Sequence, residues 1–157
     1  MSQVRAKAKR SPSLDAAAAV TAYALEEQVG FLLRCAHQRA SEMFNAVMGP
    51  FGVTPRQFAA LAKLDDLGSV SQNQLGRLTA MDPATISGVI ARLTARGYVQ
   101  QSSDPRDGRL VALGLTAAGS RAITAMKAVA AEVSRRTLAP LSAPEVAAFL
   151  KALGKIG

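Results

Sequence analysis

Residues 82–97 read D-P-A-T-I-S-G-V-I-A-R-L-T-A-R-G and give the clearest indication of the fold. This stretch is typical of a short helix with both ends marked, because Asp82 can cap free N–H groups and Pro83 has no N–H to lose. Gly97 can adopt the left-handed conformation that commonly ends a helix. Apolar residues at spacings of three and four predict one buried face: Ile86, Val89, Ile90 and Leu93.

The opposite face of this stretch carries small or hydrogen-bonding side chains, which leave room for another molecule: Ala84, Thr85, Gly88, Ala91 and Arg92. Two strand-like runs follow, Tyr98 to Ser103 and an alternating run from Val111 to Leu115. Between them, D-P-R-D-G-R at 104–109 has the Pro, Asp and Gly of a hairpin turn. A small-faced helix followed by an Arg-tipped hairpin predicts a winged helix that reads DNA.

Two capped helices precede the stretch. Thr54 and Gln57 have the spacing of a capping box, and the apolar residues that follow predict a buried face: Phe58, Leu61, Ala62 and Leu64. Residues 71–74 (S-Q-N-Q) predict a second capping box, opening a short helix that buries Leu75 and Leu78. A short helix, a tight link and the helix at 82–97 together predict a helix-turn-helix.

Long helices are predicted on either side of this lobe. Tyr23 to Val47 carries two adjoining apolar stripes, which favours packing both inside its own subunit and against another. Thr116 can cap a long helix that runs to Leu138. A third capping box, at residues 142–145, opens a last helix with apolar residues that we expect to face inward: Val146, Phe149, Leu150 and Leu153.

The composition indicates one mainly helical domain. The chain has 157 residues, 49% of them hydrophobic and 4% aromatic, and no apolar run approaches the roughly 20 residues of a membrane-spanning helix. One cysteine excludes an internal disulfide and fits the cytoplasm. With one histidine, one cysteine, no Gly-rich phosphate loop and no evident nucleophile–base pair, we expect no metal site, no cofactor and no enzymatic activity.

The net charge of +8 is compatible with a polyanionic partner, but its distribution is uneven. Residues 54–113 hold seven Lys or Arg against five Asp or Glu, so DNA recognition there depends on where the arginines lie. Residues 1–20 are expected to form a basic, flexible arm, with four Lys or Arg and no acidic residue among the first ten. The arm either aids solubility or adds non-specific phosphate contacts.

The order of these elements resembles the MarR family of bacterial winged-helix transcription regulators. The likeness is carried by residues 82–99, by D-P-R-D-G-R at 104–109 and by L-T-A-A-G at 115–119, and the architecture matches over about residues 23–156. The resemblance implies a mainly α fold with a small β-hairpin wing, forming one domain over residues 21–157. Within it, residues 54–115 would form the DNA-binding lobe, and residues 21–48 and 116–157 the dimerisation helices.

The resemblance also implies a function: a homodimeric repressor that binds a pseudo-palindromic double-stranded operator and is released by a small ligand. Half-sites about 10 bp apart would place two recognition helices in successive major grooves. Two segments, residues 31–39 and 76–85, resemble a branch that controls aromatic-acid catabolism, so the effector is expected to be an aromatic acid or its thioester. Release is expected to be allosteric, through respacing of the recognition helices.

Residues in the first turns of the recognition helix are the candidates for contact with base edges: Ala84, Thr85, Ser87 and Gly88. Arg92 can reach a guanine or a phosphate. Further candidate phosphate contacts are Arg56, Ser71, Gln72, Asn73 and Arg77. The alternative for Thr85 and Ser87 is a purely helix-starting role, and for Arg92 a solvated charge, but capping does not explain a glycine in mid-helix.

The wing is expected to place Arg106 in the minor groove, where a guanidinium reads groove width and negative potential. Arg109 would contact phosphate. Carboxylates repel phosphate, so Asp104 and Asp107 are interpreted as orienting these two arginines. The alternative is an ordinary charged turn.

An effector pocket is expected between the first long helix, the next helix and the winged lobe. Arg34 and His37, one turn apart, can face it and bind an anion. Aromatic and thioether side chains can supply the apolar wall: Phe31, Phe44, Phe51, Phe58 and Met81. The alternatives are an interface histidine and a surface ion pair of Arg34 with Glu27 or Glu42.

Two other functions remain open from the sequence. Cys35 raises the possibility of a thiol-based redox-sensing regulator, although its mid-helix position favours a buried structural cysteine. The second alternative is an architectural DNA-binding protein, which would bind all DNA sequences with similar affinity. A regulator would instead bind its own operator much more tightly than other DNA.

Overall fold

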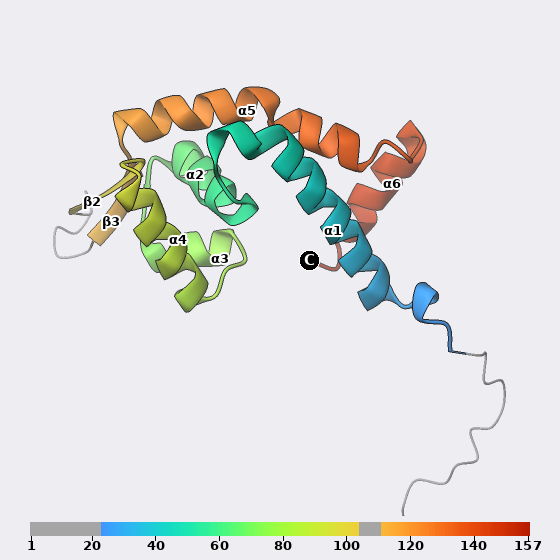
Figure 1. The fold of residues 1–157 in the computed structure, drawn as a ribbon. Helices are drawn as coiled ribbons and strands as arrows, with labels where there is room; N and C mark the ends of the chain where they lie inside the picture. The colour runs from blue at the N-terminus through green and yellow to red at the C-terminus, as the bar shows by residue number, and fades with distance from the viewer. Residues whose placement is uncertain (1–22, 104–110) are drawn as a thin grey trace, which may run out of the picture. The chain divides into compact units, whose positions relative to one another are not determined.

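The computed structural model describes residues 23–103 and 111–157 (Figure 1). The chain divides into two compact units, residues 1–34 and 35–157. The described part of the first unit contains a 3₁₀ turn, η1 (Leu25–Glu27), and the first residues of helix α1 (Val29–Met48). The rest of α1 belongs to the second unit.

The second unit is mainly helical. The 3₁₀ turn η2 (Gly49–Phe51) links α1 to the elements that follow: α2 (Pro55–Leu67), β1 (Ser69–Val70), α3 (Gln72–Leu78), α4 (Pro83–Ala95), β2 (Val99–Ser103), β3 (Val111–Leu115), α5 (Ala117–Thr137) and α6 (Ala143–Leu153). The three strands form an antiparallel sheet in the order β1-β3-β2, with Val99 opposite Leu115. The predicted fold class, mainly helical with a small β wing, is confirmed.

The core lies among α2, α3, α4 and α5, with α2 touching the other three (Figure 1). Its fully buried side chains include Leu61, Leu64, Leu75, Leu93, Ile123 and Met126. The predicted inner face of α4 is confirmed, since Ile86, Val89, Ile90 and Leu93 are all buried. Burial of that face leaves the other side of α4 directed outward.

The junction between the sheet and α5 explains the L-T-A-A-G motif. The Thr116 hydroxyl accepts from the Gly119 N–H at 3.0 Å and donates to the Gly97 carbonyl at 2.5 Å, so it caps α5 and ties it to the end of α4. A Cβ on Gly119 would overlap the carbonyl oxygen of Tyr98. Only glycine therefore permits this close approach of helix to strand.

The helix starts follow the predicted caps, with one exception. At α2, Gln57 and Thr54 satisfy each other in a complete capping box, and at α6 the Glu145 carboxylate accepts from the Ser142 N–H and hydroxyl. At α3 the Ser71 hydroxyl accepts from the Gln74 N–H at 3.3 Å, but no bond returns from the Gln74 side chain. The second predicted capping box is therefore only a simple N-cap.

The prediction of a continuous helix from Tyr23 was wrong. The chain forms the turn η1, passes through extended backbone at Gln28 (φ −79°, ψ 128°) and begins α1 at Val29. The Gln28 side-chain amide donates to the Ala24 carbonyl at 3.1 Å, so it stabilises this local turn. A side chain that bonds to nearby backbone competes with the helical pattern that periodicity predicts.

Burial predictions also failed at two places. Leu78, expected inside, is 45% exposed at the end of α3. None of the described residues of α6 is buried, and Leu150 is 53% exposed. The apolar periodicity of α6 was read correctly, but the described residues cover its apolar face only in part, since Val146 and Phe149 are half-buried and Leu150 and Leu153 are exposed. No helix in residues 23–103 and 111–157 combines the length and apolar character needed to cross a membrane.

Candidate nucleic-acid interface

Helices α3 and α4 form the predicted helix-turn-helix. In the turn, Ala80 adopts a left-handed conformation (φ 51°), and the Met81 N–H donates to the Gly76 carbonyl at 2.9 Å. Ala80 is the one non-glycine residue with positive φ among those described. This tight reversal sets α4 against α3 and presents the start of α4 outward.

Asp82 caps α4 as predicted. Its carboxylate accepts from the Thr85 N–H at 2.8 Å and from the Thr85 hydroxyl at 2.7 Å. These bonds from Thr85 lower the pKa of Asp82 below its ordinary value, so the cap is ionised at neutral pH. Because its hydroxyl proton is engaged, Thr85 presents a methyl group and an oxygen lone pair to any molecule approaching the helix.

The outer side of α4 divides into two stripes. Thr85, Gly88 and Arg92, at helical spacing, line a surface cleft together with Ala84 and Val89. Ser87 and Ala91 lie on the exposed stripe beside them. A Cβ on Gly88 would meet no heavy atom within 4 Å, so packing does not require this glycine.

Arg96 holds the C-terminal end of α4 in place. Its guanidinium donates to the carbonyls of Gly52 at 2.6 Å and Phe51 at 2.8 Å, in the turn between α1 and α2. The same group lies 4.9 Å above the Tyr98 ring, within cation–π range. The end of the recognition helix is therefore tied to the turn that begins α2.

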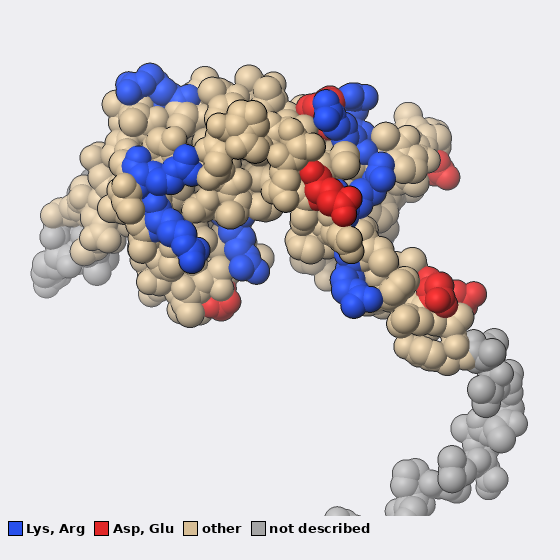
Figure 2. Space-filling model, in the orientation of Figure 1, with Lys and Arg blue, Asp and Glu red and all other residues tan. Residues whose placement is uncertain are grey.

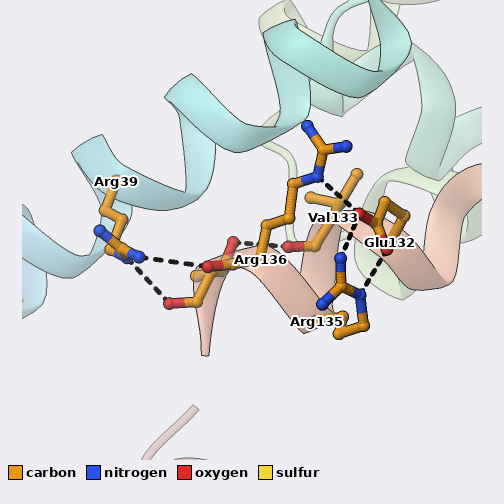
Figure 3. Close-up of polar contacts among 6 residues, drawn as sticks. Arg39, Glu132, Val133, Arg135 and Arg136 are labelled. Atoms are coloured by element: carbon orange, nitrogen blue, oxygen red, sulfur yellow. Dashed lines mark hydrogen bonds and ion pairs between the residues drawn. The ribbon is translucent and has the colours of Figure 1, made fainter. Parts of the chain in front are cut away.

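Arg39 makes a similar joint at the far end of α5 (Figure 3). Its guanidinium donates to the carbonyls of Thr137 at 2.9 Å and Arg136 at 3.2 Å, which are free at a helix C-terminus. On α5 itself, Glu132 lies between Arg135 and Arg136 and binds both at 2.6 Å. These arginines lower the pKa of Glu132 to about 2.

The cleft beside α4, here named the α1–α4 cleft, has a volume of about 660 Å³. Its walls come from α1 (His37, Ser41, Asn45), from the start of α2 (Thr54, Pro55, Arg56) and from α4 (Ala84, Thr85, Gly88, Val89, Arg92). Two arginines and a histidine line it, and its lining, drawn from the described residues, contains no Asp or Glu. Such a cleft has the size and charge to take a small organic anion.

The residues predicted to bind the effector do not gather in a single pocket. His37 lines the α1–α4 cleft, whereas Phe44 is buried in the core with its ring 6.0 Å from that of Phe58 in an edge-to-face contact. Met81 lines a second, smaller hollow of about 260 Å³ between α3 and α4. Arg34 belongs to the first unit, where its guanidinium carbon lies 5.3 Å from the centre of the Phe31 ring. Of these residues, the structure brings only His37 to the lining of the α1–α4 cleft.

Cys35 is exposed on α1, so the expectation of a buried structural cysteine was wrong. The apolar periodicity of α1 led to that expectation. The first half of this helix, however, is mostly exposed within one chain.

The remaining predicted DNA contacts lie on two segments. Ser71 caps α3, and Gln72, Asn73 and Arg77 lie on that helix, where Arg77 is exposed and lines the smaller hollow. Arg56 is exposed in the first turn of α2. The predicted wing contacts, Arg106 and Arg109, and the orienting Asp104 and Asp107 lie outside the described residues.

Basic side chains gather over α4 on the face shown in Figure 2, and acidic ones show at the N-terminal end of that helix. The outward side of the recognition helix is therefore locally positive although the lobe carries little net charge. This local charge comes from the positions of the arginines and not from the net charge of the lobe, in agreement with the interpretation of the sequence.

Sequence reasoning missed two groups of residues in this region. Ser41 and Asn45 follow His37 at intervals of four, so a polar stripe along an otherwise apolar helix was a readable signal. Arg39 and Arg96 act through backbone carbonyls that are distant in sequence. No local sequence pattern predicts hydrogen bonds between residues that are so far apart in the chain.

Comparisons with known proteins agree with this geometry. Residues 51–110 match the model of the MarR family. The chain is 41% identical over 136 residues to the transcriptional repressor NicR of Pseudomonas putida, covering 87% of this chain and 86% of NicR.

Two solved structures have the same fold at substantial identity. One is a probable transcriptional regulator from Pseudomonas aeruginosa, with a TM-score of 0.81 and 46% identity, covering 85% of this chain and all of that one. The other is BpsR of Bordetella bronchiseptica, whose DNA binding is regulated by 6-hydroxynicotinic acid; it gives a TM-score of 0.80 and 36% identity over 85% of this chain and 96% of BpsR. The chain, with its capped recognition helix and three-stranded wing sheet, belongs to the MarR family of helix-turn-helix transcriptional regulators.

Proposed function

We propose that this protein is a homodimeric repressor that binds a pseudo-palindromic operator through α4 and is released by an aromatic carboxylic acid bound in the α1–α4 cleft. The observation that carries the proposal is the cleft itself, because it joins a cationic lining to the recognition helix. A regulator of this kind acts on chromosomal DNA in the bacterial cytoplasm.

The DNA-reading part of the proposal rests on the outer side of α4. Ser87 is exposed at the start of the helix, and Gly88 leaves open space where a groove edge can approach. Thr85 offers a methyl group to a thymine methyl, since its hydroxyl proton is donated to Asp82. Arg56, Arg77 and Arg92 supply phosphate contacts from three helices.

The effector part rests on charge, size and likeness. BpsR responds to 6-hydroxynicotinic acid, an aromatic acid. In this chain, Arg56 and Arg92 can bind a carboxylate, and His37, Ser41 and Asn45 can hydrogen-bond ring substituents from the opposite wall. A volume of about 660 Å³ is ample for a single substituted ring.

The dimer rests on apolar surface that one chain leaves uncovered. In α6 and the residues after it, Leu150, Leu153 and Ile156 are 53%, 36% and 69% exposed. In the first unit, Leu25, Val29 and Leu32 are between 46% and 66% exposed. Apolar surface of this extent is typical of an interface between subunits.

Titration of the protein with 6-hydroxynicotinic acid in a calorimeter tests the effector site. We expect binding by the wild type, loss of at least tenfold in affinity in His37→Ala, and no change in Gln38→Ala. Gln38 is the matched control because it is the exposed neighbour of His37 and does not line the cleft. Equal affinities of the two variants would remove His37 from the site.

Arg106→Ala tests the proposed wing contact. We expect weaker operator binding, because a guanidinium in the minor groove is lost, with the dimer and the thermal unfolding temperature unchanged. Unchanged operator affinity, measured by fluorescence anisotropy on the same duplex, would exclude this contact.

A further inference from the structure

One stripe of the recognition helix serves two surfaces. Thr85, Gly88 and Arg92 belong to the outer side of α4, which is proposed to face DNA, and they also form one wall of the α1–α4 cleft. The neighbouring stripe, with Ser87 and Ala91, does not line the cleft. A molecule in the cleft therefore contacts the recognition helix α4 itself, and not only the helices that pack against it.

The cationic groups are shared in the same way. Arg56 in the first turn of α2 and Arg92 in the last turn of α4 are both exposed, and both line the cleft. Each is also a candidate for phosphate contact. A carboxylate bound to a guanidinium in two-pronged fashion occupies one edge of it and neutralises its charge, and a ligand in the cleft also fills the space beside these side chains, so a phosphate binds the same arginine less favourably.

We infer that the effector carboxylate and the DNA backbone bind Arg56 and Arg92 in mutual exclusion, so that release occurs by direct competition. This inference rests on the proposed function, since it needs an acid that binds in the cleft. It differs from purely allosteric release, in which the effector acts by changing the spacing of the recognition helices.

The two mechanisms predict different titrations. Under competition, the apparent Kd of the operator rises without limit, by about 100-fold per cleft when the acid is at 100 times its own Kd. With two clefts in a dimer, the slope on logarithmic axes lies between one and two. Under allostery, the apparent Kd reaches a plateau once the acid saturates, typically after a rise of roughly 5- to 150-fold.

The experiment uses the full-length protein, 6-hydroxynicotinic acid as the probe and a duplex selected from a random library as the operator. Operator affinity is measured by anisotropy at constant ionic strength, with the acid raised to about a thousand times its calorimetric Kd. A rise without plateau supports competition. A plateau overturns competition while the proposed function stands, and absence of any binding of the acid overturns both.

Three variants assign the competition to residues. Arg56→Gln and Arg92→Gln should each lose at least fivefold in affinity for both the acid and the operator, and each should reduce the salt slope of operator binding by about one. Arg77→Gln is the matched control, since Arg77 lines the other hollow. It should lose operator affinity and salt slope while its affinity for the acid stays unchanged.

Circular dichroism establishes that each variant is folded, and either cleft variant alone suffices if the other is not. Loss of operator affinity with full retention of acid binding in both Arg56→Gln and Arg92→Gln would contradict the inference. Parallel loss of both activities in Arg77→Gln would also contradict it, because the shared site would then not be the α1–α4 cleft.

Discussion

Two glycines of the second unit illustrate how differently one residue type can be used. Gly119 lies against the Tyr98 backbone, where any Cβ would overlap a carbonyl oxygen, whereas Gly88 faces open space on the outer side of α4. The first glycine is required by folding. The second costs helix stability in return for access to the helix surface.

These two glycines make a matched pair of substitutions. Gly88→Ala should raise the free energy of unfolding by roughly 0.5–1 kcal/mol, because alanine favours the helix interior, yet weaken operator binding by crowding the groove. Gly119→Ala should lower it by about 3 kcal/mol through overpacking. Urea unfolding with operator titration measures both; a Gly88→Ala protein with unchanged operator affinity would argue against contact at this position.

The ion pairs of Glu132 should make the stability of the protein depend on pH. Bonds from Arg135 and Arg136 lower the folded-state pKa of Glu132 from 4.5 to about 2. The stabilisation is therefore present above about pH 4.5 and is lost as the pH falls toward 2.

Glu132→Gln should consequently be less thermally stable than the wild type at pH 6, with the gap closing as the pH approaches 2. Melting curves between these limits measure it. A gap that stays constant over this range would show that the ion pairs contribute no pH dependence.

At the scale of elements, the recognition helix is held at both ends by polar bonds and in the middle by apolar burial. Asp82 caps its start, Arg96 ties its end to the turn after α1, and Leu93 is fully buried between. Orientation of α4 therefore depends on contacts that never touch DNA.

Substitution of Arg96 tests this tie. Arg96→Ala should lower the free energy of unfolding by about 1 kcal/mol for the loss of its hydrogen bonds and should weaken operator binding. Tyr98→Phe is the control, because the hydroxyl it removes lies 3.5 Å from the guanidinium and contributes little. Hydrogen exchange at the end of α4 should rise in Arg96→Ala only; equal exchange in both variants would show that Arg96 does not hold the helix.

The sequence predicted most elements because their signals are local. A few neighbouring residues are enough to identify the caps at Thr54, Asp82 and Thr116 and the periodic apolar faces of α2 and α4. The two-residue strand β1 was missed because two residues show no alternation. The start of α1 was misplaced because the turn stabilised by Gln28 competes with periodicity.

The site was predictable to a lesser degree, for a physical reason. Outward residues of α4 follow from its buried face, so Thr85, Gly88 and Arg92 could be named from spacing alone. A cleft, by contrast, is made by three helices whose approach depends on long-range packing. Of the residues that the sequence analysis assigned to the effector pocket, His37 lines this cleft and Phe44 is buried in the core.

At the scale of the whole molecule, the apolar surface left by α6 should bring two chains together. Leu150→Glu should shift the protein toward monomer at micromolar concentration and reduce operator affinity by 100-fold or more, because a monomer loses bivalent attachment. Light scattering coupled to size exclusion measures the mass. Leu67→Glu, at an exposed leucine of α2, is the control and should remain dimeric.

Sequence-specific DNA binding is tested by the ratio of affinities for the selected operator and for a shuffled duplex of the same length, at one salt concentration near the physiological value. A regulator that reads sequence through α4 should bind the operator at least about a thousandfold more tightly, and Ser87→Ala should reduce that ratio. Equal affinity for the two duplexes would contradict the account and would indicate an architectural DNA-binding protein instead.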